Sequence, residues 1–129
     1  MEIVAALFIE NVNFRQDPPG GPTRIDITGA YFSTKLGEFP ATLTPHLLVL
    51  LRAESEEGRS GTVDVRFVRR DSGDEVGRHR QPQMISPPGQ FFYQLVRPEL
   101  SFDEPGTIDA HCEIPETGST IVVPLTALP

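Results

Sequence analysis

Three side chains in the C-terminal quarter of the chain have the types and the spacing that a metal site could use. Asp109, His111 and Glu113 occupy alternate positions in the segment 105–114. On an extended strand such side chains share one face at a spacing of about 6–7 Å, so two of them could bind one metal ion. A further ligand would have to come from elsewhere, and the candidates are His46, His79 and Glu99. We expect the simpler alternative, in which the three side chains form the solvated face of a half-buried strand.

Cys112 directly follows His111, and the two have the residue types of a nucleophile and its general base. Consecutive side chains of a strand point to opposite faces, so they could not form a catalytic pair. We therefore expect Cys112 to be a small buried side chain of the core. It is the only cysteine, which excludes an intramolecular disulfide bond and favours a reducing, cytoplasmic location.

The segment 66–80 concentrates basic side chains in an acidic protein. The chain has a net charge of −7, whereas five arginines against three acidic residues give this segment +2. The arginines are Arg66, Arg69, Arg70, Arg78 and Arg80. Such a patch could bind a phosphate group, an acidic peptide or an acidic face of a second copy. The alternative, which we favour, is that the arginines solvate a hairpin and pair with its acids.

The elements that carry these residues are predicted by alternation. Apolar residues recur at every second position from Ile108 to Ile114 and again from Ile121 to Leu125, which is typical of two half-buried antiparallel strands. The same pattern predicts the other strands, at 2–14, 24–33, 45–52, 61–70, 75–80, 91–96 and 100–102. We expect the first strand to be covered on both sides, because both of its faces are apolar.

Proline- and glycine-rich stretches at 16–23 and 81–90 are expected to be loops. No amphipathic helix of normal length is present. The sequence therefore predicts an all-β protein: one antiparallel β-sandwich domain over 1–129, Ig-like or similar, with about seven to nine strands and no major helix.

An aromatic run at Phe91, Phe92 and Tyr93 places large side chains on both faces of one predicted strand. We expect both faces to be covered. The alternative is that one aromatic side chain is exposed as a binding or dimer surface.

Several segments of the chain, taken together, resemble a family of small bacterial domains of unknown function. These segments are 7–12, 27–31, 39–43, 48–52 and 61–68. The resemblance implies a compact bacterial β-sandwich in the cytoplasm. It implies no activity and no catalytic residues.

Composition and motifs narrow the classes of function. The net charge argues against binding to nucleic acid or to an anionic membrane, because phosphate neutralisation requires a basic face. The apolar stretch 3–9 is short and flanked by Glu2 and Glu10, so we expect neither a signal peptide nor a transmembrane helix. No phosphate-binding loop, dinucleotide-binding glycine pattern, nucleophile elbow or paired-cysteine zinc spacing is present, which makes an enzyme the less favoured class.

We therefore expect a non-catalytic module without a cofactor that acts by contact with a protein partner or by self-association. A homodimer through an edge strand is one form of this, and contact through the arginine hairpin is another. The first alternative is a metal-binding domain or metal-dependent enzyme that uses Asp109, His111 and Glu113. The second is a sandwich that binds a small ligand of carbohydrate type, for which the chain offers no tryptophan.

Overall fold

The computed structural model describes the whole chain, Met1 to Pro129, as eleven strands and a single 3-10 turn. The strands are β1 (Glu2–Gln16), β2 (Thr23–Ala30), β3 (Ser33–Lys35), β4 (Ala41–Leu43), β5 (His46–Arg52), β6 (Ser60–Arg69), β7 (Glu75–Met84), β8 (Phe91–Val96), β9 (Leu100–Phe102), β10 (Gly106–Ile114) and β11 (Ser119–Leu128). The predicted all-β class is confirmed. The number of strands exceeds the predicted seven to nine because β3, β4 and β9 have only three residues each, and such short strands leave little alternation to detect.

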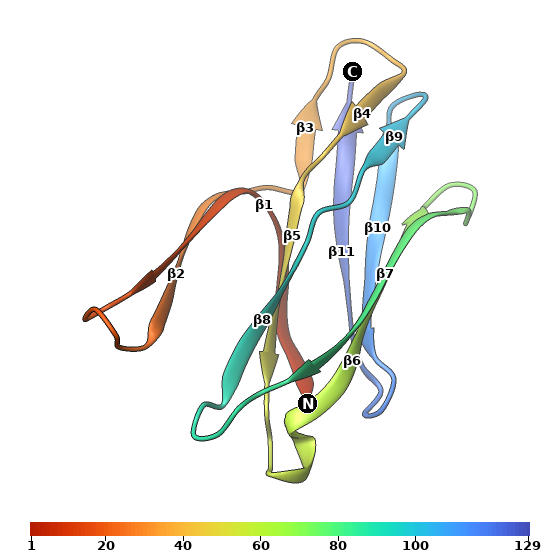
Figure 1. The fold of residues 1–129 in the computed structure, drawn as a ribbon. Helices are drawn as coiled ribbons and strands as arrows, with labels where there is room; N and C mark the ends of the chain where they lie inside the picture. Colours follow the sequence, from red (N-terminus) through yellow and green to blue (C-terminus); the bar gives the residue numbers. More distant parts are fainter.

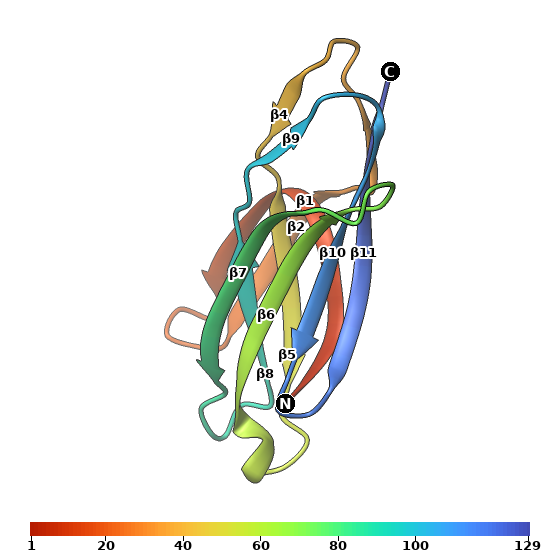
Figure 2. The same ribbon diagram turned by 90° about the vertical axis from the view of Figure 1, so that its right-hand side faces the viewer.

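Two larger sheets form the layers of the sandwich (Figures 1 and 2). A four-stranded sheet has the order β2-β1-β5-β8, and a five-stranded sheet has the order β3-β11-β10-β6-β7. All neighbours in them are antiparallel except β11 and β3. The short ribbon of β4 and β9 lies at the end of the sandwich where the C-terminus is located (Figure 1).

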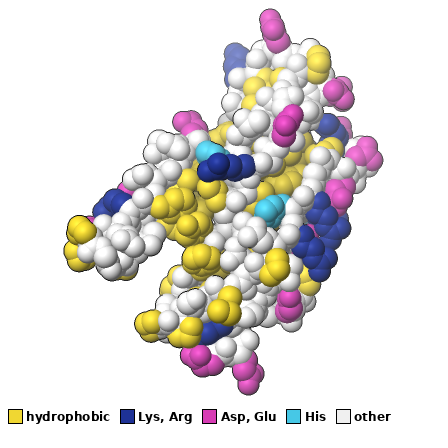
Figure 3. All heavy atoms as spheres, viewed as in Figure 1, with side chains coloured by type: hydrophobic (Ala, Val, Ile, Leu, Met, Phe, Trp, Pro, Cys, Tyr) yellow, Lys and Arg dark blue, Asp and Glu magenta, His cyan; other side chains and the backbone are white.

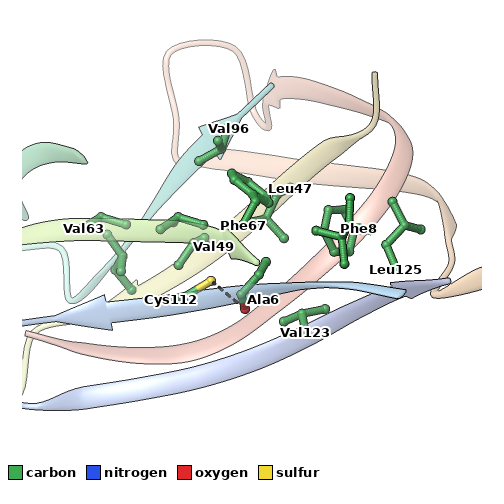
Figure 4. Packing of buried hydrophobic residues seen from close by; sticks show 14 of the residues in the cluster. Ala6, Phe8, Leu47, Val49, Val63, Phe67, Val96, Cys112, Val123 and Leu125 are labelled. Atoms are coloured by element: carbon green, nitrogen blue, oxygen red, sulfur yellow. Dashed lines mark hydrogen bonds between the residues drawn. The ribbon is translucent and has the colours of Figure 1, made fainter. Parts of the chain in front are cut away.

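The core lies between these two sheets. Figure 4 shows inward-pointing side chains from both layers, with Phe8, Leu47 and Val49 on one side and Phe67, Cys112 and Val123 on the other. The alternate residues of the C-terminal hairpin that were predicted to be buried, from Ile108 to Ile114, are at most 1% exposed. The prediction for this strand is confirmed.

β1 belongs to the body of the sandwich in its first half and leaves it in its second half. Residues 2–9 pair with β5, while residues 9–16 pair with β2. The second half of β1 and β2 together form a two-stranded ribbon, residues 10–30, which we call the arm; it projects from the sandwich in Figure 1. Phe8 and Ile9, on opposite faces of β1, are both buried, so the strand is covered on both sides at this point. The prediction is wrong for Val4 and Phe14, which are 47% and 37% exposed.

The last strands of the chain close the sandwich against the first. The backbone N–H of Ile3 donates to the hydroxyl of Ser119 at 2.9 Å. The hydroxyl of Thr117 donates to the carbonyl oxygen of Met1 at 2.8 Å. The side chain of Met1 is itself buried in the core. The start of β1 is therefore held by the turn between β10 and β11.

β7 is longer than the alternation indicated. The loop predicted at 81–90 is wrong for residues 81–84, which continue β7 as far as Met84. Pro82 faces Thr62, and the N–H of Thr62 donates to Glu116, away from β7. The nitrogen of Pro82 therefore lies on the open side of an edge strand, where the missing N–H leaves no ladder bond unmade.

Candidate functional site

The three residues predicted for a metal site do share one face. Asp109, His111 and Glu113 of β10 lie on the outer face of the five-stranded sheet, turned away from the core. Both carboxylate oxygens of Asp109 accept hydrogen bonds from Arg70, at 2.9 and 2.7 Å. The Arg70 guanidinium lowers the pKa of this carboxyl group. The Asp109 carboxylate is thus already engaged by a cation of the protein.

The candidate third ligands do not join this face. His46 lies at the start of β5 in the other sheet. His79 lies opposite Val65, on the inner face of β7, and Glu99 lies between β8 and β9. No group of three or more histidine, cysteine, aspartate or glutamate side chains is arranged to hold a metal ion.

The predicted arginine patch is largely occupied by the protein's own acceptors. Asp64, only 5% exposed, accepts two hydrogen bonds from Arg78 at 3.1 and 2.7 Å, and Arg80 lies 3.8 Å from the same carboxylate. Arg70 pairs with Asp109 as described, and Arg69 donates to the backbone carbonyl of Ser101 at 2.6 Å. Arg66 is the one member whose side chain makes no ion pair or hydrogen bond. Asp64 was missed as a partner, although the hairpin register places it beside these arginines.

Replacing Asp64 with asparagine is expected to destabilise the fold at neutral pH and to have little effect in acid. Hydrogen bonds from Arg78 lower the pKa of Asp64 in the folded protein. The stabilisation is present above the unfolded-state pKa of about 4 and disappears as the pH falls through the lower folded-state pKa. Urea unfolding of both proteins between pH 7 and pH 2 should show two stability curves that converge. The exposed turn variant Asp71→Asn is the control, and a gap that stays constant with pH would contradict this account.

Cys112 has no role at an exposed site. Its side chain is 1% exposed, and burial raises the pKa of its thiol to about 12. The thiolate required for a nucleophile is therefore not formed at neutral pH. The prediction that Cys112 belongs to the core is confirmed.

The arm is amphipathic across its two strands. The register of β1 and β2 places one set of apolar side chains on the same face: Val12, Phe14, Ile25 and Ile27. The opposite face carries Asn11, Asn13, Arg15, Arg24, Asp26 and Thr28. The charges near the tip are paired, since Arg15 contacts both Asp26 and Asp17. A two-stranded ribbon of this kind has too little core of its own for stability and depends on a covering surface.

The apolar face of the arm turns toward the outer face of the four-stranded sheet. The ring of Phe14 stacks on Tyr93 of β8, with centroids 4.6 Å apart and an angle of 19° between the planes. Ile9 and Leu48 are fully buried but do not belong to the core between the sheets, so they form a second apolar layer on the side that the arm crosses. Phe14 pairs with Ile25 in the outer half of the arm, so this contact holds that half of the arm against β8.

An apolar groove of about 570 Å³ lies between the tip of the arm and β8. Its walls are Pro22, Thr23 and Ile25 from the arm, Val4 and Leu50 from the sheet, and Gly89, Phe91, Phe92 and Tyr93 from the β7–β8 loop and β8. Figure 3 shows hydrophobic side chains gathered in the hollow between the arm and the rest of the molecule. We call this feature the arm groove.

The expectation that both faces of the aromatic run are covered is wrong. Phe91 is 63% exposed and Phe92 is 42% exposed, while Tyr93 is partly covered by Phe14. The reason is that β8 is an edge strand, and an open groove separates its first residues from Pro22 and Thr23 of the arm. Val4, at an irregularity in the β1–β5 register, adds another exposed apolar side chain to the same groove.

The structure contains no helix that is long and apolar enough to cross a membrane. No protein-family model matches the chain, and comparisons with curated proteins and with solved structures give no match. The resemblance to small bacterial domains stays a prediction.

Proposed function

We propose that this domain is a non-catalytic module that acts by protein contact and that the arm groove is its contact surface. The observation that carries the proposal is the concentration of exposed large apolar side chains there, Phe91 above all. Contiguous apolar patches are uncommon on monomeric proteins, and aromatic side chains are enriched at the centres of protein interfaces. The arginine hairpin is a weaker candidate because its charges are largely paired internally.

The location we propose is the bacterial cytoplasm. In support of this, the single cysteine is buried and unpaired, so that the fold does not depend on an oxidising compartment. The proposed partner is a protein, since the groove offers apolar contact area and no cluster of positive charge for a nucleic acid.

Site-specific photo-cross-linking tests this function. A photoreactive benzoylphenylalanine in place of Phe91 should give discrete protein adducts in the source cells, identified by mass spectrometry. The control position is Val122, which is 51% exposed on the outer face of the five-stranded sheet and should give none. Binding partners captured equally from both positions, or none from position 91, would count against a contact surface in the arm groove.

A further inference from the structure

β8 presents one free edge of backbone hydrogen-bonding groups. The N–H of Ala53 donates to the carbonyl oxygen of Gln90 at 2.8 Å, which fixes the phase of the β5–β8 ladder. Since antiparallel ladders alternate, Phe92, Gln94 and Val96 pair with β5. The backbone groups of Phe91, Tyr93 and Leu95 therefore point away from the sheet. The one hydrogen bond that reaches these groups is a 3.4 Å bond from the Gln94 side chain to the carbonyl oxygen of Leu95, and the same side chain is also bonded to Gln81 and Gln83 of β7.

The other long edge strands, β7 and β2, have prolines, charges or irregular pairing that discourage association with another strand. The sequence of β8 has none of these features. β7 has Pro82, Arg78 and Arg80, and its register with β6 is irregular near Phe67. β2 carries the charged side chains of Arg24 and Asp26. Natural edge strands are protected in these ways against association. β8, with the sequence Phe-Phe-Tyr-Gln-Leu-Val, has no charge, no proline and no glycine.

We propose that β8 pairs antiparallel with β8 of a second copy, about a two-fold axis that passes through Tyr93. This proposal rests on the proposed function and names the occupant of the open edge beside the arm groove. In this register Tyr93 faces Tyr93 of the second copy, and Phe91 faces Leu95. All three residues with free backbone groups then become hydrogen-bonded pairs, because their positions are symmetric about Tyr93. The two four-stranded sheets join into one.

The charges at the two ends of β8 favour a second copy of this chain as the partner. Phe91 adjoins Arg52, and four carboxylates at this end of the sheet outnumber three cations, so the end is acidic by one charge. The carboxylates are those of Glu2, Glu54, Glu56 and Glu57, and the cations are Arg52, Arg59 and the N-terminal amino group. Arg97 follows the other end of β8 and makes no ion pair. A two-fold axis through the middle of the strand brings the Arg97 end of each copy to the acidic end of the other. A different protein would need its own strand with a positive charge opposite the acidic end of β8 and a negative charge opposite Arg97.

Cysteine cross-linking with mild oxidation tests the register. Facing residues in a hydrogen-bonded pair have Cα atoms about 5.5 Å apart, within the range of a disulfide bond. Tyr93→Cys should therefore give a covalent dimer by itself. Phe91→Cys should cross-link with Leu95→Cys in a mixture but not with itself, because the two copies of position 91 lie about 15 Å apart. Thr28→Cys on the β2 edge and the unmodified chain, whose Cys112 is buried, are the controls.

Light scattering tests the assembly. The unmodified protein should have twice the 14.2 kDa mass of one chain. Leu95→Pro removes an outward N–H together with the leucine side chain, and it should give a folded monomer because an edge strand can hold a proline, as β7 holds Pro82. Leu95→Ala removes the side chain alone and should remain dimeric. Phe91→Lys, at a side chain that is mostly exposed in one copy, should also give a monomer without changing the backbone.

The outcomes separate this proposal from the function on which it rests. An unmodified protein that is monomeric over a dilution series, or cross-links that ignore the predicted register, would overturn pairing through β8. If photoreactive position 91 then captures a different protein, the arm groove remains a contact surface and only the self-pairing is wrong. If position 91 captures nothing as well, both proposals fail.

Discussion

Leu48→Ala is expected to lower the free energy of unfolding by about 2–5 kcal/mol, although Leu48 lies outside the core between the sheets. Its side chain is 1% exposed and lies on the face that the arm crosses. The cavity should loosen the arm more than the body. Hydrogen exchange measured by mass spectrometry should therefore rise most in residues 10–30.

The matched control for this substitution is Leu128→Ala on β11. Leu128 is 43% exposed, so its truncation should change stability by less than about 0.5 kcal/mol. Equal protection of the arm in Leu48→Ala and the unmodified protein would mean that the arm does not depend on this apolar layer.

Phe67→Ala is expected to cost about 3–5 kcal/mol, the largest effect of any single change considered. Phe67 is 1% exposed, belongs to β6 between β10 and β7, and its ring covers Gly77 at 3.5 Å from where a β-carbon would stand. Because residue 77 is a glycine, it has no side chain that could fill the cavity left by the Phe67 ring. Urea unfolding at pH 7 measures the loss.

Phe32→Ala provides the comparison for Phe67, since Phe32 is 68% exposed and the same number of atoms is removed. Its stability should stay close to that of the unmodified protein. Similar losses for both variants would show that burial at position 67 is not what stabilises β6.

The alternation of apolar residues was sufficient to predict the all-β class and the longer strands. Buried residues such as Ile108, Ala110 and Cys112 alternate with polar residues along β10, so the local sequence is enough to predict which side chains form its inner face. β7 shows the limit of this reasoning. Pro82 is a loop signal in sequence, and only the position of β7 at the edge of the sheet makes a proline acceptable there.

The arm groove could be predicted only in part. The apolar parity of Val12 and Phe14 in β1 and of Ile25 and Ile27 in β2 is present in the sequence. Both faces of β1 are apolar near Ile9, however, so no local signal marks where this strand leaves the body. The exposure of Phe91 follows from where the arm ends, which is a matter of tertiary structure.

The predicted site residues illustrate the same limit. Strand parity correctly places Asp109, His111 and Glu113 on one face, because parity is a local property. Whether a carboxylate is free to bind a ligand depends on neighbours that are distant in sequence, such as Arg70, 39 positions from Asp109.

The bonds between the two ends of the chain have a consequence for folding during synthesis. Ile3 and Ser119 are 116 positions apart, and Met1 is bound by Thr117. While the ribosome is still adding β10, the first strand lacks Thr117 and Ser119, which bind its start in the folded protein. The apolar residues of this strand are then still exposed. The sandwich can close only when β11 has left the exit tunnel. Before that point the nascent chain should pass through a stage at which β1 is open to chaperones or to wrong pairing.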